Sequence, residues 1–290
     1  MNNLFYFNIT YKCNNKCKDC CSHNTRDKNK RTVSVDDIKV IDDKFKCTES
    51  DVWVISGGEP TVADNFDEII NYCLSKSKHI ILYTNGRNLH KINAECFERI
   101  IVPLYGTESG HNDYVGSSMA YSETVNALTN IIERNPDKIE LKLLINDLTA
   151  MKDLLQNDDW QILKKNNRFS ISRVIKPNVE IDSNVLLFTE NLIMELLSED
   201  KTVKFYDLPF CKFSEKFQNN ILDNYDCSLN SKYRIICGSQ FGKYTVFGFN
   251  KRADYYIDCS TCNKSIFCTK IMQRYYCPVL TTKKCWIGTE

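Results

Sequence analysis

Segments typical of strands and helices alternate along the first two thirds of this 290-residue chain. Apolar, β-branched runs bounded by turn residues indicate strands, and apolar residues at helical spacing indicate the helices between them. The predicted strands are residues 5–11, 51–56, 79–84, 100–105, 139–145 and 169–174. About six strand–helix units predict a parallel sheet with helices outside, because parallel strands need long crossover connections.

Helix signals fall between these strands. Ser34 with Asp37 is typical of a helix N-cap, and apolar residues follow it at helical spacing over residues 38–45. Asp64 is predicted to cap the next helix, whose apolar face lies within residues 66–73. Further helices are predicted at residues 92–99, 121–134, 148–156 and 184–197.

Three cysteines follow the first predicted strand in a C-x-x-x-C-x-x-C pattern: Cys13, Cys17 and Cys20. Three closely spaced thiolates suit an iron–sulfur cluster that keeps one iron without a protein ligand, and an open metal position is where chemistry occurs. The alternatives are a zinc site or three ordinary thiols. Zinc sites, however, usually join one C-x(2–4)-C pair to a second pair elsewhere.

The second predicted strand runs directly into Gly57, Gly58, Glu59 and Pro60. The two glycines allow the backbone to approach a ligand closely, Glu59 can accept from an ammonium group, and Pro60 stiffens the exit. Alone, these four residues are also compatible with a plain connection between a strand and a turn. Both motifs lie at strand carboxyl ends, where parallel barrels place their ligands.

This pair of motifs resembles the radical S-adenosylmethionine (SAM) superfamily. The resemblance implies that the three cysteines bind a 4Fe–4S cluster whose open iron chelates SAM, and that residues 57–60 hold the SAM amino group. One electron from the cluster then splits SAM into methionine and a deoxyadenosyl radical, which abstracts hydrogen from a substrate. The residue before the third cysteine is often aromatic or His in the family, near adenine, whereas here it is Asp19.

The resemblance also implies a fold and further site residues. The expected fold is α/β, a partial (β/α)6 TIM-like barrel over residues 1–200. Three strand ends resemble segments that contact ribose and methionine in one branch of the family: Thr84 with Asn85, Tyr105 with residues 111–113, and Asn146. Ordinary turn chemistry explains each of them equally well. Arg173 lies in an apolar strand pattern, and a buried arginine needs a partner, so a carboxylate of SAM or substrate and a structural ion pair both stay open.

The composition changes after residue 200, where eight of the fifteen cysteines lie. We therefore predict a second region, residues 201–290, as a small Cys-rich C-terminal extension. Its tightest group, Cys259, Cys262 and Cys268, resembles the SPASM and twitch extensions of radical SAM enzymes, which carry one or two auxiliary iron–sulfur clusters. Met272 occupies the place of the next cysteine in that pattern.

The fourth ligand of this group is then Cys211 or Cys277. Cys211 is preferred, because a similar Pro-Phe-Cys element precedes the cysteine group in some relatives. The remaining tail cysteines are enough for a second four-ligand site, with free thiols as the alternative: Cys227, Cys237, Cys277 and Cys285. Four other cysteines are interpreted as small apolar packing residues: Cys21, Cys47, Cys73 and Cys96.

Charge and hydropathy exclude several classes of function. Lys and Arg total 38 against 37 Asp and Glu, so a net charge of +1 gives no general attraction to nucleic acid. No run of about 18 apolar residues predicts a membrane span, and no signal-peptide pattern opens the chain. Cysteines at metal-type spacing without a signal peptide are expected as reduced thiolates in a cytoplasmic protein.

Two classes of function remain open. The first is a radical SAM enzyme that modifies a peptide or, alternatively, a small molecule such as a sugar or cofactor precursor. Such an enzyme needs a flavodoxin- or ferredoxin-type electron donor. A separate leader-peptide binding protein is also expected, because the cysteine triplet begins at residue 13. The second class is a zinc-rich interaction or nucleic-acid-binding protein, which explains the tail but neither residues 57–60 nor the strand–helix alternation.

Overall fold

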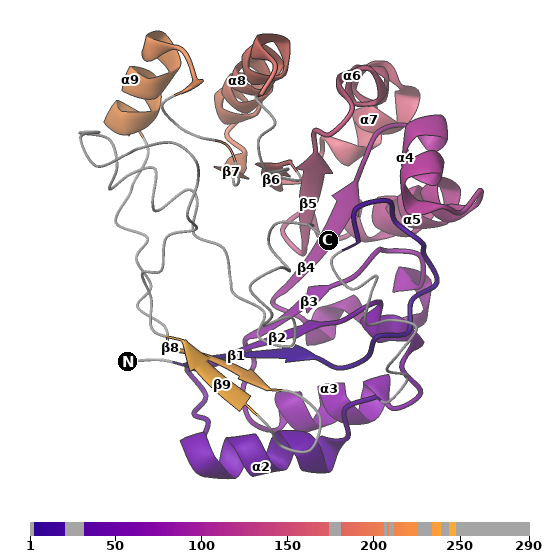
Figure 1. Ribbon diagram of the computed structural model, residues 1–290, viewed down its shortest axis with the longest axis vertical. Helices are drawn as coiled ribbons and strands as arrows, with labels where there is room; N and C mark the ends of the chain where they lie inside the picture. The colour runs from indigo at the N-terminus through magenta and orange to yellow at the C-terminus, as the bar shows by residue number, and fades with distance from the viewer. Residues whose placement is uncertain are drawn as a thin grey trace.

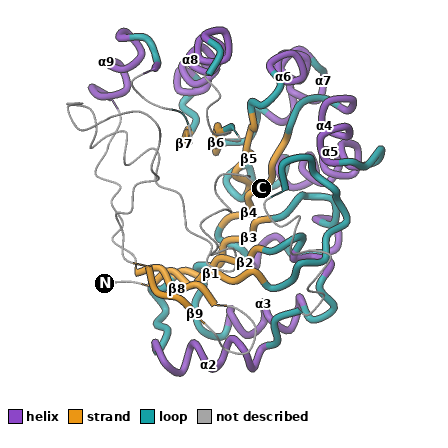
Figure 2. The backbone as a smooth tube through the Cα atoms, in the orientation of Figure 1, coloured by secondary structure: helices purple, strands orange, loops and turns teal. Residues whose placement is uncertain are grey.

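The computed structural model describes residues 3–20, 32–173, 181–205, 208, 212–224, 234–238 and 244–247. These residues form a nine-stranded sheet with the order β7-β6-β5-β4-β3-β2-β1-β8-β9. Strands β1 to β7 are parallel, β8 is parallel to β1, and β9 is antiparallel to β8. The sheet curves into an open arc, and helices α2 to α7 line its convex side (Figures 1 and 2).

The strands are β1 (Asn3–Asn8), β2 (Val52–Ser56), β3 (Ile80–Tyr83), β4 (Arg99–Leu104), β5 (Ile139–Leu144), β6 (Arg168–Ser172), β7 (Thr202–Phe205), β8 (Arg234–Gly238) and β9 (Tyr244–Phe247). The α-helices are α2 (Val35–Phe45), α3 (Phe66–Leu74), α4 (Glu108–Val115), α5 (Ala120–Ile132), α6 (Leu148–Gln156), α7 (Asp158–Leu163), α8 (Ser183–Ser198) and α9 (Glu215–Asn224). Short 3-10 turns are η1 (Pro60–Val62), η2 (Leu89–Lys91) and η3 (Ala94–Cys96).

The predicted partial barrel is confirmed, with two more parallel strands than expected: β7 beside β6 and β8 beside β1. The six predicted strands correspond to β1 to β6. Strand β7 was not predicted, because its four residues include a threonine and a lysine and are too few for a clear period. The division near residue 200 stays a prediction, and most of the expected Cys-rich extension lies outside the described residues.

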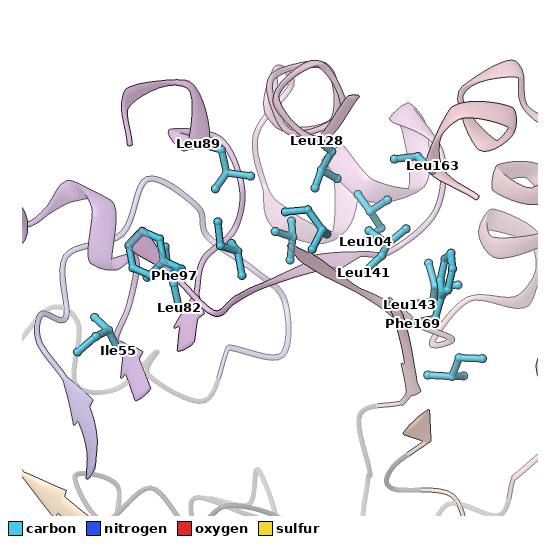
Figure 3. Packing of buried hydrophobic residues seen from close by; sticks show 14 of the residues in the cluster. Ile55, Leu82, Leu89, Phe97, Leu104, Leu128, Leu141, Leu143, Leu163 and Phe169 are labelled. Atoms are coloured by element: carbon cyan, nitrogen blue, oxygen red, sulfur yellow. The ribbon is translucent and has the colours of Figure 1, made fainter. Parts of the chain in front are cut away.

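Apolar side chains on the convex face of the sheet make the core. In β6, Phe169 and Ile171 belong to this core, so by the alternation of a strand Ser170 and Ser172 face the concave side. Figure 3 shows Leu141, Leu143 and Phe169 on their strands beneath the helices of the convex side. The core continues to the first strands, where a smaller set packs on the opposite face: Leu4, Val52 and Val54.

Of three local predictions about helices, one is confirmed and two were wrong. Ser34 forms the expected capping box with Asp37 at the start of α2. The prediction that Asp64 caps α3 was wrong: Asn65 is the N-cap residue, and Asp64 pairs with Lys12 at 2.9 Å. The predicted helix over residues 92–99 was also wrong. The Asn93 side chain caps only the single turn η3, and β4 begins soon after it.

Among the residues that the structure describes, no helix is long and apolar enough to cross a bilayer.

Candidate active site

The segment after β1, residues 12–20, carries Cys13, Cys17 and Cys20 and is called the cysteine loop here. It contains no helix or strand. All three cysteines are thiols rather than disulfides, and all three are half-buried. The shape of the loop therefore depends on the elements that it contacts.

The carboxyl end of β2 holds the beginning of the cysteine loop. The Gly58 amide donates to the Thr10 carbonyl at 2.7 Å, and the Glu59 amide donates to the Lys12 carbonyl at 2.9 Å. A Cβ atom at Gly58 would lie only 2.5 Å from the Lys12 carbonyl oxygen, and one at Gly57 2.5 Å from that of Thr10. Both glycines are thus required for the backbone of β2 to approach the cysteine loop, a use that the sequence did not indicate.

Glu59 joins the ends of β2 and β3. Its side chain is fully buried. The carboxylate accepts hydrogen bonds from the Thr61 amide and hydroxyl at 3.1 and 2.6 Å, the Thr84 hydroxyl at 2.7 Å and the Asn85 amide at 2.6 Å. Burial raises the pKa of Glu59, and these donors oppose the rise. Because protein donors surround the carboxylate, the geometry favours a positioning role for Glu59. Its predicted contact with the SAM ammonium stays a prediction.

Helix α4 supports the second half of the cysteine loop. The Lys16 and Lys18 amides donate to the Val115 and Tyr114 carbonyls at 2.7 and 2.9 Å. Carbonyl groups in the last turn of a helix have no partner within the helix, so the loop satisfies two of them. Gly116 ends the helix with φ +67° in the left-handed region, where glycine is favoured.

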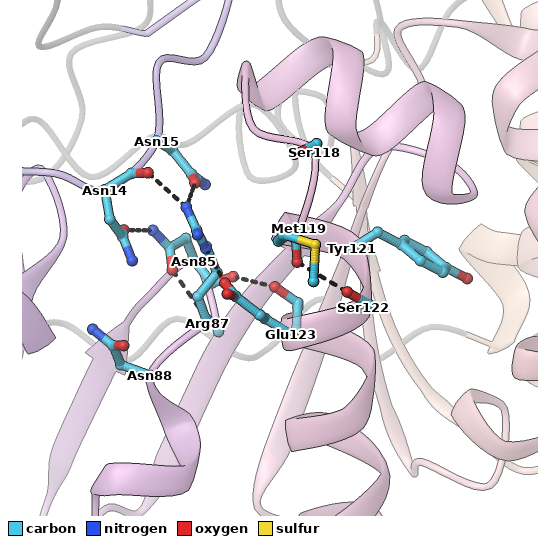
Figure 4. A network of polar contacts seen from close by, with 12 residues as sticks. Asn14, Asn15, Asn85, Arg87, Asn88, Ser118, Met119, Tyr121, Ser122 and Glu123 are labelled. Atoms are coloured by element: carbon cyan, nitrogen blue, oxygen red, sulfur yellow. Dashed lines mark hydrogen bonds and ion pairs between the residues drawn. The ribbon is translucent and has the colours of Figure 1, made fainter.

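Arg87 supports the loop from a third side (Figure 4). One of its terminal nitrogens, Nη1, donates to the Asn14 carbonyl at 2.6 Å and to the Asn15 side chain at 2.9 Å. Its Nε donates to Glu123 of α5. The Asn85 side chain also contacts Asn14, at 2.6 Å. Asn85 is among the residues predicted from the sequence, whereas Arg87, two residues further along the chain, is not.

An aromatic pair brings three of the predicted positions together. Tyr105, directly after β4, stacks on Tyr114 of α4 with ring centroids 4.0 Å apart. The Tyr114 hydroxyl donates to Asp19 at 3.2 Å and also bonds to Asn146 after β5. Burial raises the pKa of Tyr114, as does its carboxylate neighbour Asp19. An aromatic ring thus reaches the residue before the third cysteine, although the residue at that position is not itself aromatic.

His111 lies beside this pair in α4. It is 1% exposed, and neither ring nitrogen has a hydrogen-bond partner among the residues that the structure describes. Its ring contacts Tyr105 and Tyr121 edge to face at 5.5 and 5.9 Å. Burial, with the nearby charge of Arg87, lowers the pKa of His111 to about 4, so the imidazole is neutral at neutral pH.

Arg173 comes directly after β6 and follows the buried Ser172, whose side chain faces the concave side of the sheet. Burial lowers the pKa of Arg173, and among the described residues no carboxylate forms an ion pair with it. The neighbouring Ser172 hydroxyl is buried and has no hydrogen-bond partner within the described ranges. Cys237 lies on β8 opposite Tyr6 of β1. The other tail cysteines lie outside the described residues: Cys211, Cys227, Cys259, Cys262, Cys268, Cys277 and Cys285.

The donor set of the cysteine loop, three thiolates on one short segment, fits an iron–sulfur cluster, which binds each thiolate through a different iron. The Asn15 amide also lies 3.4 Å from the Cys13 sulfur, a contact typical of cluster ligands.

Residues 7–145 match the model of the radical SAM superfamily. This range contains the cysteine loop, residues 57–60 and strands β2 to β5. Just under half of the chain, 139 of its 290 residues, therefore matches the radical SAM superfamily of enzymes. The relation to this superfamily accounts for the location of both motifs at one edge of the open sheet.

Two curated relatives of this radical SAM chain differ in their products. The chain is 26% identical over 162 residues to the Fe-coproporphyrin III synthase of Methanosarcina barkeri, covering 52% of this chain and 40% of that protein. It is 28% identical over 128 residues to the mycofactocin maturase MftC of Mycolicibacterium smegmatis, covering 42% and 32% respectively. The chain thus spans well under half the length of either relative.

Among solved structures, the chain is similar to SuiB of Streptococcus suis bound to S-adenosylmethionine. The TM-score is 0.58 at 16% identity, covering 99% of this chain and 76% of SuiB. SuiB bound to its precursor peptide SuiA gives a TM-score of 0.56 at 17% identity, covering 81% and 57%. At these identities the likeness establishes the fold alone.

Proposed function

We propose that this radical SAM chain cleaves SAM reductively and uses the resulting deoxyadenosyl radical to abstract hydrogen from a peptide substrate. The observation that carries the proposal is the interlocking of the cysteine loop with residues 57–59 at the carboxyl edge of the sheet. When bound, a 4Fe–4S cluster supplies the electron for SAM cleavage. The protein supplies three thiolates, an open coordination position and the polar strand ends around it.

Residues of the chain then divide into two groups. Cys13, Cys17 and Cys20 ligate the cluster, and Glu59 fixes the loops around it. The remaining predicted residues, at the ends of β2 to β6, face SAM: Gly57, Gly58, Pro60, Thr84, Asn85, Tyr105, Asn146 and Arg173. Arg173 is proposed to hold a carboxylate of SAM or of the substrate, since it is half-buried, no carboxylate among the described residues pairs with it, and an unpaired charge is costly to bury.

The anaerobically reconstituted protein, given reductant and SAM, tests the proposal through the deoxyadenosine that it forms. Cys17→Ala is expected to abolish deoxyadenosine, while Cys96→Ala is expected to leave it unchanged, because the half-buried Cys96 in η3 lies outside the loop. Deoxyadenosine from Cys17→Ala at the wild-type rate would refute the site. A colourless protein containing zinc instead of iron would favour the zinc-rich class of protein.

A peptide substrate is favoured by the name of one relative, a maturase, and by the SuiB structure with a precursor peptide. A small-molecule substrate is the second candidate, because another relative is named as a coproporphyrin synthase. Co-expression with a short peptide encoded beside this chain separates the two. A mass change in that peptide, dependent on Cys17, supports the first candidate.

We also propose auxiliary clusters in the tail, one on Cys211, Cys259, Cys262 and Cys268, and a second on Cys227, Cys237, Cys277 and Cys285. Cys262→Ala is expected to lower the iron content by one cluster while leaving SAM cleavage largely intact. An unchanged iron content would refute the first auxiliary site. A flavodoxin- or ferredoxin-type donor and a separate leader-peptide binding protein complete the proposed set of partners.

A further inference from the structure

Arg87 lies between the cysteine loop and α5, and its side chain is only 14% exposed. Its Nη1 contacts Asn14 and Asn15, the two residues after Cys13, at 2.6 and 2.9 Å. On the opposite side its Nε bonds to Glu123, which is 40% exposed. The guanidinium is thus a fixed, partly desolvated positive charge held against the cysteine loop (Figure 4).

The contact with Asn15 leads directly to a ligand sulfur. Asn15 is 3% exposed, and its backbone amide donates to the Cys13 sulfur at 3.4 Å. Arg87 holds the side chain of the same residue, and it also holds the carbonyl of Asn14 before that amide. The direction of the amide toward sulfur therefore depends on Arg87. Hydrogen bonds to ligand sulfurs and nearby charge are two of the factors that set the potential of an iron–sulfur cluster.

We propose that Arg87 is a positioning residue that sets the reduction potential of the cluster on the cysteine loop, and that Glu123 attenuates its effect. This inference rests on the proposed function, because it requires a cluster at Cys13, Cys17 and Cys20. Reduction adds negative charge to the cluster. A nearby cation and an amide donor to sulfur stabilise the added charge, whereas the carboxylate of Glu123 opposes it.

The two partners therefore have opposite effects on the potential. Arg87→Gln removes the cation and loosens the Asn15 amide, so the potential falls. Glu123→Gln keeps an oxygen acceptor for the Arg87 Nε but removes the negative charge, so the potential rises. If the pair Arg87 and Glu123 only holds the loop in place, both variants should loosen the loop and shift the reduction potential of the cluster in the same direction.

The test is an anaerobic redox titration of the full-length reconstituted protein, followed by the electron paramagnetic resonance signal that Cys17→Ala removes. This signal separates the loop cluster from any others in the chain. Arg87→Gln is expected to make reduction about tenfold less favourable, a shift of about 59 mV for one electron. Arg87→Lys should recover part of the shift, since it keeps the charge but loses the forked geometry.

Lys91→Gln is the matched control. Lys91 lines the same pocket of about 340 Å³ as Arg87 and Glu123, and among the described residues no hydrogen bond or ion pair joins it to the cysteine loop. In Lys91→Gln, the equilibrium constant for reduction of the cluster should stay within twofold of the wild-type value. A shift of both Arg87→Gln and Glu123→Gln in one direction, or no shift in a fully loaded Arg87→Gln, would overturn the inference.

The test still decides if the Arg87→Gln protein does not bind the cluster. If Arg87→Gln binds no iron, Glu123→Gln alone decides: a rise in potential supports the inference, and a fall or no change overturns it. If Cys17→Ala keeps both iron and signal, the cluster assignment itself has failed, which is a different outcome from an unchanged potential in the Arg87 variants.

Discussion

The close approach of β2 to the cysteine loop makes Gly58→Ala a sharp test of the site. The new Cβ would lie 2.5 Å from the Lys12 carbonyl oxygen and 2.7 Å from that of Tyr11, whereas ordinary contact begins at 3.4 Å. Both neighbours are backbone atoms, so no side-chain rotation relieves the clash. The strand end must separate from the loop by almost 1 Å.

The expected cost follows from what that separation breaks. The bonds from the Gly58 and Glu59 amides to Thr10 and Lys12 would both lengthen. Two lost hydrogen bonds cost about 1–3 kcal/mol, and overpacking adds about 1–3 kcal/mol. The total of about 2–6 kcal/mol is large against a typical stability of about 5–15 kcal/mol. Lys12 precedes Cys13, so the displacement reaches a cluster ligand.

Iron content and thermal unfolding of anaerobically reconstituted protein measure both effects. Gly58→Ala should unfold roughly 3–10 °C lower than wild type and lose the iron that Cys17→Ala also loses. Ser56→Ala, two residues earlier on the same strand, is the control and should change stability by less than about 0.5 kcal/mol. A Gly58→Ala protein with the wild-type midpoint and full iron would refute the argument that the glycine is needed for this approach.

Three further changes test other parts of the structure. Because the pKa of His111 is lowered to about 4, the folded state binds fewer protons than the unfolded state below pH 6.5. Stability should therefore fall by up to about 3 kcal/mol between pH 6.5 and 4. His111→Phe should remove that dependence in urea unfolding of the metal-free protein. Glu140 is buried, which raises its pKa, but Lys204 and Arg99 outweigh burial and hold the pKa below its usual range. Glu140→Gln should cost about 2–3 kcal/mol at neutral pH, and the difference should vanish as pH falls through the lowered pKa, again by urea unfolding. Ser34→Ala should cost about 1 kcal/mol by the same measurement, through loss of the capping box of α2.

Much of the sheet could be predicted from sequence, because its strands are buried on one or both faces and read as apolar runs. Helix α4 could not, since over residues 108–115 the large apolar side chains come only at the end, at Tyr114 and Val115. The helix is nevertheless essential to the site, because its last carbonyls hold the cysteine loop. Its stability comes from tertiary contacts rather than from a periodic pattern.

The candidate site shows the same division. Spacing alone identified Cys13, Cys17 and Cys20, because metal ligation requires particular atoms at short separation. The sequence did not identify Arg87, because arginines in turns are usually exposed and its role depends on partners that are distant in sequence. The hydrogen bonds that Glu59 accepts from residues at the ends of β2 and β3 could not be predicted either, because they join segments that are distant in sequence, and its contact with SAM stays a prediction.

The cysteine loop itself explains why these supporting residues matter. Residues 12–20 form no helix or strand, so ordering them costs about 1–2 kcal/mol per residue in backbone entropy. Contacts from β2, α4 and Arg87 offset that cost in the folded protein before any cluster binds. A ligand set held in place by its supporting shell binds without further ordering. A three-cysteine pattern transplanted without its glycines, the carbonyls of α4 and the arginine would therefore bind iron weakly, even with identical spacing.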